Sequence, residues 1–97
     1  EPIDAYALAE PVKVLANITE AMLNALESSA WKERKEALDA ILGVVRVPRI
    51  QEGGQQQYGL LVGRLVKRIG DVNVSVVIVA AQCLEALANG LRRAFAP

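Results

Sequence analysis

The sequence predicts an all-α fold, namely a short α-solenoid of two helical hairpins that follow one another along the chain. Two observations predict this class. First, 53% of the 97 residues are apolar and only 4% are aromatic, and this excess of small and aliphatic side chains suits closely packed helices. Second, apolar residues recur at three- and four-residue steps, as they do on one face of a helix. The same pattern returns after 43 residues, which indicates a repeated unit in a single small domain.

The first hairpin follows an irregular opening segment. Residues 1–16 contain two prolines, which predict an extended arm or a short broken helix. Thr19 is expected to cap a helix that runs to about Glu27. A second helix is predicted over about residues 30–46, and it must end before Pro48, because the residue before a proline avoids the helical conformation.

The second hairpin is expected after a flexible linker at Gln51–Gln57, which contains two glycines and three glutamines in a row. A third helix is predicted over about residues 57–69. Asn73 then follows a tight turn and is the expected N-cap of a fourth helix that ends near Asn89–Gly90. A buried strand at Val72–Val79 is the alternative, since β-branched residues favour sheets, but the sequence offers no second strand to pair with it.

The internal repeat indicates the architecture. A period of about 40–47 residues with two helices per unit is typical of HEAT and armadillo solenoids. We expect a first HEAT-like repeat at residues 17–47, a second at 57–90, and the start of a link to a missing third repeat at 91–97. A shift of 43 residues pairs the following positions: Leu15 with Tyr58, Ile18 with Leu61, Met22 with Leu65, Leu26 with Ile69, Trp31 with Val74, Ala37 with Ala80, Ile41 with Leu84, and Val44 with Leu87.

The predicted fourth helix is apolar nearly all the way round, so it must be covered on several sides. We expect a further repeat to cover its face around Val76, Val79, Cys83 and Ala86. Without that repeat the face would be exposed, and exposed apolar patches tend to find partners. The isolated chain is therefore expected to self-associate.

The sequence shows no arrangement of side chains that indicates catalysis, and predicts no enzyme, cofactor or metal site. It contains no histidine, and its one cysteine, Cys83, lies mid-helix, where it is expected to be a small buried hydrophobe rather than a nucleophile. Glu33, Glu36 and Asp39 fit a solvated helix face that pairs with nearby lysines. Gly53–Gly54 lacks the lysine and the strand–helix context of a phosphate-binding loop.

Charge and hydropathy argue against nucleic acid and membrane as partners. Eleven basic and eleven acidic residues cancel, although the half after Glu52 is basic. Five cations there make phosphate binding the weaker alternative, because no aromatic residues alternate with them to stack on bases. They are Arg64, Lys67, Arg68, Arg92 and Arg93. No apolar run reaches the length of a membrane span, and a single cysteine without a secretory signal favours an intracellular setting.

Trp31 is the strongest candidate for a binding residue. This sole tryptophan follows Ser28–Ser29 at a helix-start signal and precedes a charged run. Tryptophan is enriched at binding hot spots, because it offers a large rigid apolar surface with one polar edge. The alternative is a hydrophobic staple or a half-buried boundary residue.

With these features the chain resembles a TOG domain of the microtubule-polymerase family of cytoskeleton-associated proteins, and in particular the second TOG domain of such arrays. Three segments carry the resemblance over nearly the whole chain. They are Ile3–Tyr6 with Glu10–Leu15, Trp31–Leu38, and Asp71–Val74 with Gly90–Phe95.

The resemblance implies a fragment of a six-repeat HEAT paddle that binds αβ-tubulin along the edge formed by its intra-repeat loops. The first such loop would be Ser28–Lys32, with the Trp31 side chain against β-tubulin, and the second would be Asp71–Val74. Arg34 and Lys35 are expected to anchor the repeat internally. The tubulin-binding residues that the resemblance implies are Trp31, Lys32, Asn73 and Val74.

By the same resemblance, the module would promote microtubule polymerisation at plus ends, in the cytoplasm and at microtubules, spindle and centrosome. No nucleic acid, membrane or cofactor is implied. The alternative is a generic HEAT-repeat scaffold for protein–protein interactions.

Overall fold

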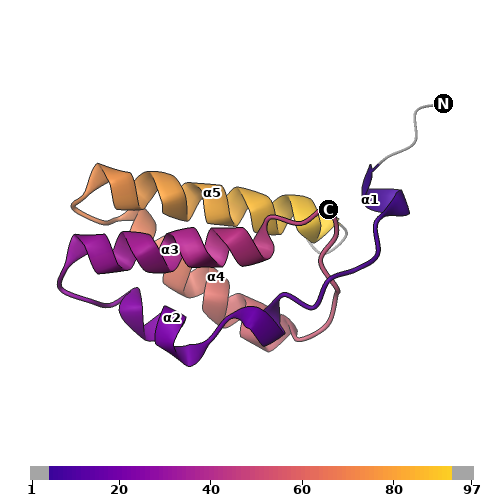
Figure 1. Cartoon of the computed structure of the whole chain (residues 1–97), viewed down its shortest axis with the longest axis horizontal. Coiled ribbons are helices and arrows are strands. Elements are labelled where there is room, and N and C mark those ends of the chain that lie inside the picture. The colour runs from indigo at the N-terminus through magenta and orange to yellow at the C-terminus, as the bar shows by residue number, and fades with distance from the viewer. Residues whose placement is uncertain (1–4, 93–97) are drawn as a thin grey trace.

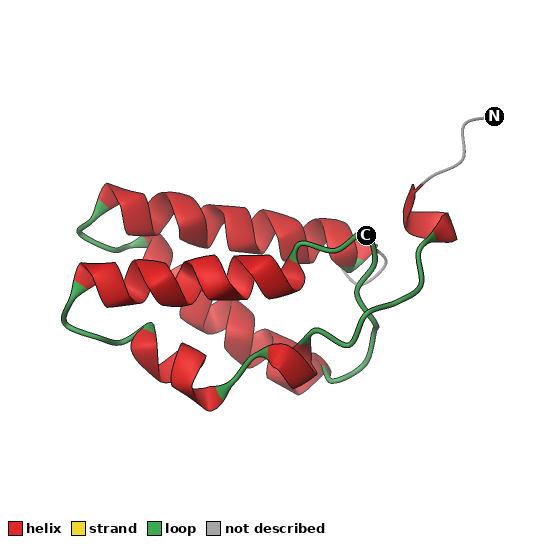
Figure 2. Ribbon diagram, in the orientation of Figure 1, coloured by secondary structure: helices red, strands yellow, loops and turns green. Residues whose placement is uncertain are grey.

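The computed structural model describes residues 5–92, and its described elements are helices joined by loops (Figures 1 and 2). In chain order these are α1 (Ala5–Leu8), the 3-10 helix η1 (Leu15–Asn17), α2 (Glu20–Ala25), α3 (Trp31–Val45), α4 (Gln55–Ile69) and α5 (Val74–Gly90). The all-α fold class is confirmed. Because α5 begins at Val74, the alternative of a buried strand at Val72–Val79 is wrong.

Two helical hairpins, α2–α3 and α4–α5, form the body of the molecule. α3 packs against α5, α5 packs against α4, and α2 packs against α3. Their shared core contains fully buried aliphatic side chains from every one of these elements except α2, whose contribution is half-buried. The helices α3 and α5 begin 43 residues apart, at the register of the internal repeat. The assignment of residues 17–47 and 57–90 to two HEAT repeats stays a prediction.

The hairpins differ in their first helices. α4 is a regular helix, whereas the corresponding part of the first hairpin is divided into η1 and the short α2. Thr19 caps α2 as predicted: its Oγ1 accepts a hydrogen bond from the Met22 amide at 3.1 Å. α2 ends at Ala25 rather than Glu27, because the next three amides donate to carbonyls three residues back, which tightens the last turn.

The predicted flexible linker at Gln51–Gln57 is partly wrong. The three glutamines form the first turn of α4, which begins at Gln55. Glutamine is a good helix former, so this outcome needs no special contact. The loop is shortened to residues 51–54, and within it Gly53 and Gly54 have φ of 105° and 62°, a conformation that other residues rarely adopt.

The arm at the N-terminus is tied to the rest of the molecule at the end where both hairpins finish. Val12 pairs with the inter-hairpin linker: its amide donates to the Arg49 carbonyl at 3.0 Å, and its carbonyl accepts from the Gln51 amide at 2.9 Å. Between these two residues the Ile50 amide donates to the Gly90 carbonyl at 2.8 Å. Residues 5–16 combine the two predicted alternatives, since the short helix α1 is followed by extended chain that pairs at Val12. Residues 1–4 lie outside the described part.

The expectation for the exposed face of the fourth helix is wrong. Val76, Val79 and Cys83 are buried, and Ala86 is half-buried, because this side of α5 packs against the neighbouring helices. The apolar residues that remain accessible lie elsewhere. They include Leu60, Val66 and Ile69 on α4, with Val74, Ile78 and Ala81 on α5, while Val77, Leu84 and Ala88 are half-buried. The predicted link at 91–97 falls within the described residues only for Leu91, which is buried, and Arg92.

Candidate functional site

The loops within the two hairpins lie at the same end of the molecule, opposite the described chain ends (Figure 1). The first loop, residues 26–30, joins α2 to α3, and the second loop, residues 70–73, joins α4 to α5. The resemblance places the loops at Ser28–Lys32 and Asp71–Val74. In the structure Trp31 and Lys32 already belong to the first turn of α3, and Val74 is the first residue of α5.

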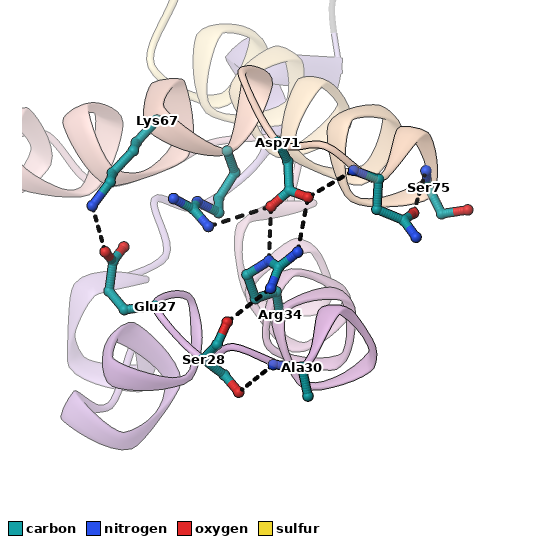
Figure 3. Close-up of polar contacts among 9 residues, drawn as sticks. Glu27, Ser28, Ala30, Arg34, Lys67, Asp71 and Ser75 are labelled. Carbon is teal, nitrogen blue, oxygen red and sulfur yellow. Dashed lines mark hydrogen bonds and ion pairs between the residues drawn. The ribbon is translucent and has the colours of Figure 1, made fainter.

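Arg34 joins the two loops through one guanidinium group (Figure 3). Its Nε and Nη2 donate to the two carboxylate oxygens of Asp71 at 2.7 and 2.9 Å. Its Nη1 donates to the backbone carbonyl of Ser28 at 2.8 Å. This two-pronged geometry is specific to arginine, because the planar guanidinium matches a carboxylate with two parallel bonds. Arg34 is thus buried and has the structural role that was expected, but it joins the two hairpins instead of anchoring one repeat alone.

Asp71 is the centre of this polar cluster, and its side chain is only 2% exposed. Besides the two bonds from Arg34, it accepts one from Nη1 of Arg68 at 3.3 Å and one from the Asn73 amide at 2.9 Å. The Arg34 hydrogen bonds hold the pKa of Asp71 below its ordinary value, and the Asn73 amide and the nearby charges act in the same direction. Asp71 is therefore ionised at neutral pH and organises the second loop around its carboxylate.

A second ion pair joins the hairpins nearby, between Glu27 and Lys67 (Figure 3). Nζ of Lys67 lies 2.5 Å from the Glu27 carboxylate, and this hydrogen bond lowers the pKa of Glu27. Both side chains are exposed to solvent. Exposed pairs of this kind contribute little to stability, because water and salt screen them.

The four residues implied as tubulin contacts all lie at this end of the molecule. Trp31 is 38% exposed and Val74 is 70% exposed, so both offer apolar surface, and Lys32 is exposed beside them. Asn73 is half-buried, because its side chain caps α5 by accepting a hydrogen bond from the Ser75 amide at 2.9 Å. Its predicted role as N-cap is confirmed, whereas its role as a contact residue stays a prediction.

Sequence reasoning missed one feature of this edge. Val72 is 99% exposed at the tip of the second loop, the most exposed large apolar residue of the described chain. The available signal was an apolar residue at the centre of a predicted tight turn. The expectation that Lys35 anchors the repeat internally is wrong, because Lys35 pairs with Asp39 at 2.9 Å on the outer surface of α3. This pair confirms, for Asp39, the predicted solvated face that pairs with nearby lysines.

Several side chains considered for catalysis or phosphate binding are buried or paired in the described part of the chain. Cys83 is fully buried, and burial raises the pKa of its thiol to about 12, so it is a poor nucleophile. Two of the α4 cations considered for phosphate binding, Lys67 and Arg68, are paired with carboxylates. Within residues 5–92 no three metal-ligating side chains come together, and no helix is long and apolar enough to cross a bilayer.

Comparison with known proteins identifies relatives over almost the whole chain. It is 42% identical over 93 residues to the spindle pole body component alp14 of Schizosaccharomyces pombe, which covers 95% of the chain. It is 36% identical over 97 residues to the protein mini spindles of Drosophila melanogaster and 31% identical over 96 residues to the protein MOR1 of Arabidopsis thaliana. Each of these two alignments covers 98% of the chain.

These relatives are far longer than the chain. It spans 11% of alp14 and 5% each of mini spindles and MOR1. No protein-family model and no solved structure matches the chain.

Proposed function

Because the chain belongs to the TOG-domain family of microtubule-associated proteins, we propose that it binds αβ-tubulin through the edge formed by its two loops. Trp31 contacts β-tubulin in this proposal, with Lys32, Asn73 and Val74 beside it. Within a longer protein the module promotes microtubule polymerisation at plus ends, since several weak modules on one chain raise avidity without new contacts. The names of alp14 and mini spindles support a place at the spindle.

The observation that carries this proposal is the exposed apolar surface at the loop end. Val72 and Val74 are largely exposed, and Trp31 is exposed over more than a third of its surface. These side chains belong to different hairpins, yet hydrogen bonds hold their loops together. An aromatic anchor beside smaller apolar residues is the usual composition of a protein-binding hot spot.

The test compares the affinity of the 97-residue chain for purified αβ-tubulin with that of two variants. Trp31→Ala should weaken binding by about tenfold or more, the loss expected for a hot-spot tryptophan. Leu60→Ala is the matched control, because Leu60 is a large exposed apolar residue on α4, outside the loop edge. A chain labelled at its N-terminal amine reports binding by fluorescence anisotropy, which leaves Cys83 untouched.

Equal losses in Trp31→Ala and Leu60→Ala would show that tubulin does not bind at the loop edge. A complete lack of tubulin binding by the unaltered chain would instead favour the second function, a generic HEAT-repeat scaffold for other protein partners.

A further inference from the structure

The contacts between the two loops depend on a single buried ion pair. Arg34 lies in the second turn of α3 and reaches back to Ser28 in the first loop and across to Asp71 in the second. Asp71 in turn holds the Asn73 amide, next to Val74. A continuous series of hydrogen bonds therefore runs from the Ser28 carbonyl through Arg34 and Asp71 to the Asn73 amide (Figure 3). Its two ends lie three residues before Trp31 and one residue before Val74.

This ion pair is a joint between the hairpins and not a feature of each repeat. The residue 43 positions after Arg34 is Val77, and the residue 43 positions before Asp71 is Ser28. Neither hairpin therefore contains the pair by itself. Ser28 and Asp71, which occupy equivalent positions in the two repeats, are both acceptors for the same guanidinium group.

We propose that Arg34 and Asp71 are positioning residues, which fix the two loops relative to each other so that Trp31 and Val74 reach one partner surface together. This inference rests on the proposed function. Surfaces that are ordered before binding lose less conformational entropy when the complex forms, and so bind more tightly. Neither positioning residue needs to touch the partner, because Arg34 is buried and the Asp71 side chain is almost fully covered.

The test begins without tubulin, because the only tryptophan of the chain lies at the end of this joint. Asp71→Asn keeps the size of the side chain and removes its charge. In this variant we expect acrylamide to quench Trp31 fluorescence more strongly, and amide hydrogens of both loops to exchange faster. The matched control is Glu27→Gln, which removes the other carboxylate that joins the hairpins, but at an exposed site. It should leave both signals unchanged.

The second measurement is tubulin affinity, taken at a temperature at which circular dichroism shows each variant to be folded. Asp71→Asn should weaken binding by about tenfold, in the range by which residues outside an interface modulate it, and Glu27→Gln should not. Arg34→Lys is a second variant, for use if Asp71→Asn fails to fold. It keeps the positive charge but loses the two-pronged geometry and the bond to Ser28, so it should behave in the same way.

The outcomes separate this inference from the proposed function. If the unaltered chain binds tubulin and Asp71→Asn binds equally well, the positioning role is wrong and the proposed function stands. If the unaltered chain does not bind tubulin, the proposed function fails. If, in addition, Trp31 quenching is unchanged in Asp71→Asn and Arg34→Lys, the Arg34–Asp71 pair does not fix the loops, and the positioning role is wrong as well. Stronger Trp31 quenching and faster amide exchange in Asp71→Asn, together with weaker tubulin binding by the same variant, support both the positioning role and the proposed function.

Discussion

Trp31 occupies a position between core and surface, and its exposure predicts how the stability of the domain responds to its removal. It is 38% exposed and does not belong to the buried core cluster. Trp31→Ala should therefore lower the free energy of unfolding by about 1 kcal/mol, near the centre of the distribution for point mutants. Leu38→Ala, at a fully buried position on the same helix, should cost about 2–5 kcal/mol.

Urea denaturation followed by far-ultraviolet circular dichroism measures both values without using the tryptophan signal. A loss in Trp31→Ala as large as that in Leu38→Ala would place the indole in the core, and any loss of binding would then follow from unfolding.

Asp71 makes the stability of the chain depend on pH at the acidic end. Its pKa is lower in the folded state than its ordinary value of 3.8, mainly because of the Arg34 hydrogen bonds. The stabilisation is fully present above that ordinary value, and it is lost as the pH falls through the lower pKa of the folded state. We expect the melting temperature to fall below about pH 4, where unfolding takes up the proton.

Asp71→Asn should flatten this acid dependence, which melting curves at a series of pH values would detect. Glu27 contributes in the same direction, since Lys67 lowers its pKa, so Glu27→Gln measures the share of the exposed pair. An unchanged acid profile in Asp71→Asn would mean that the buried pair does not control it.

At the residue scale, features that depend on short stretches of sequence could be predicted. The caps at Thr19 and Asn73 follow from their own side chains and the helices after them. Trp31 at the start of a helix was predicted in the same way. The partner of Arg34 could not be, because 37 residues separate it from Asp71 and only the packing of α3 on α5 brings them together.

Two glycines inside helices give a matched prediction at the scale of elements. A methyl group added at Gly63 in α4 would meet no atom within 4 Å, whereas at Gly90 in α5 it would lie 2.5 Å from the Ile50 side chain. Gly63→Ala should stabilise the chain by about 0.5–1 kcal/mol, because alanine is the better helix former. Gly90→Ala should destabilise it, since Ile50 is buried and has little room to move.

Thermal and urea unfolding of the two variants, compared with the unaltered chain, gives both signs. Destabilisation by Gly63→Ala would indicate that something other than solvent lies against that face of α4.

The lengths of the elements show where local reasoning fails. The start and end of α5 were predicted from Asn73 and Asn89–Gly90, since both signals are local. The start of α4 was placed two residues late, because a run of glutamines after two glycines has the composition of a linker as well as of a helix. In the structure the loop ends at Gly54, whose left-handed backbone lies close to the Leu15 side chain, and α4 begins at the next residue.

At the scale of the whole molecule, the two hairpins are not equally covered. Residues 34, 38, 41 and 45 of α3 are buried against the second hairpin, and all four are Arg or aliphatic. The corresponding residues of α5 are Val77, Ala81, Leu84 and Ala88, none of them fully buried. The same contrast separates Leu26, which is buried, from Ile69, which is exposed. The α4–α5 hairpin thus leaves partly exposed the equivalent of the face that the first hairpin uses for packing.

This partly exposed face replaces the buried residues Val76, Val79 and Cys83 as the surface expected to drive self-association. It carries no charge, so two copies of the chain can bring these faces together without repulsion. We expect the isolated chain to self-associate through it at high concentration, and Ala81→Glu to reduce the association. Sedimentation equilibrium measures both, with Ala40→Glu as the control, because Ala40 is an exposed alanine on the outer side of α3. Equal association of the two variants would place the contact elsewhere.

The backbone hydrogen bonds around Ile50 have a consequence for how the molecule unfolds. There the arm bonds to the linker between the hairpins, and the linker bonds to the last turn of α5, so three segments distant in sequence meet at one buried side chain. The short α2 gives the first hairpin little helical stability of its own, since isolated helices of this length are marginal. Such a hairpin has no stable existence without its neighbour. The two hairpins should therefore unfold together in one transition, with α3 and α5 equally protected until it occurs.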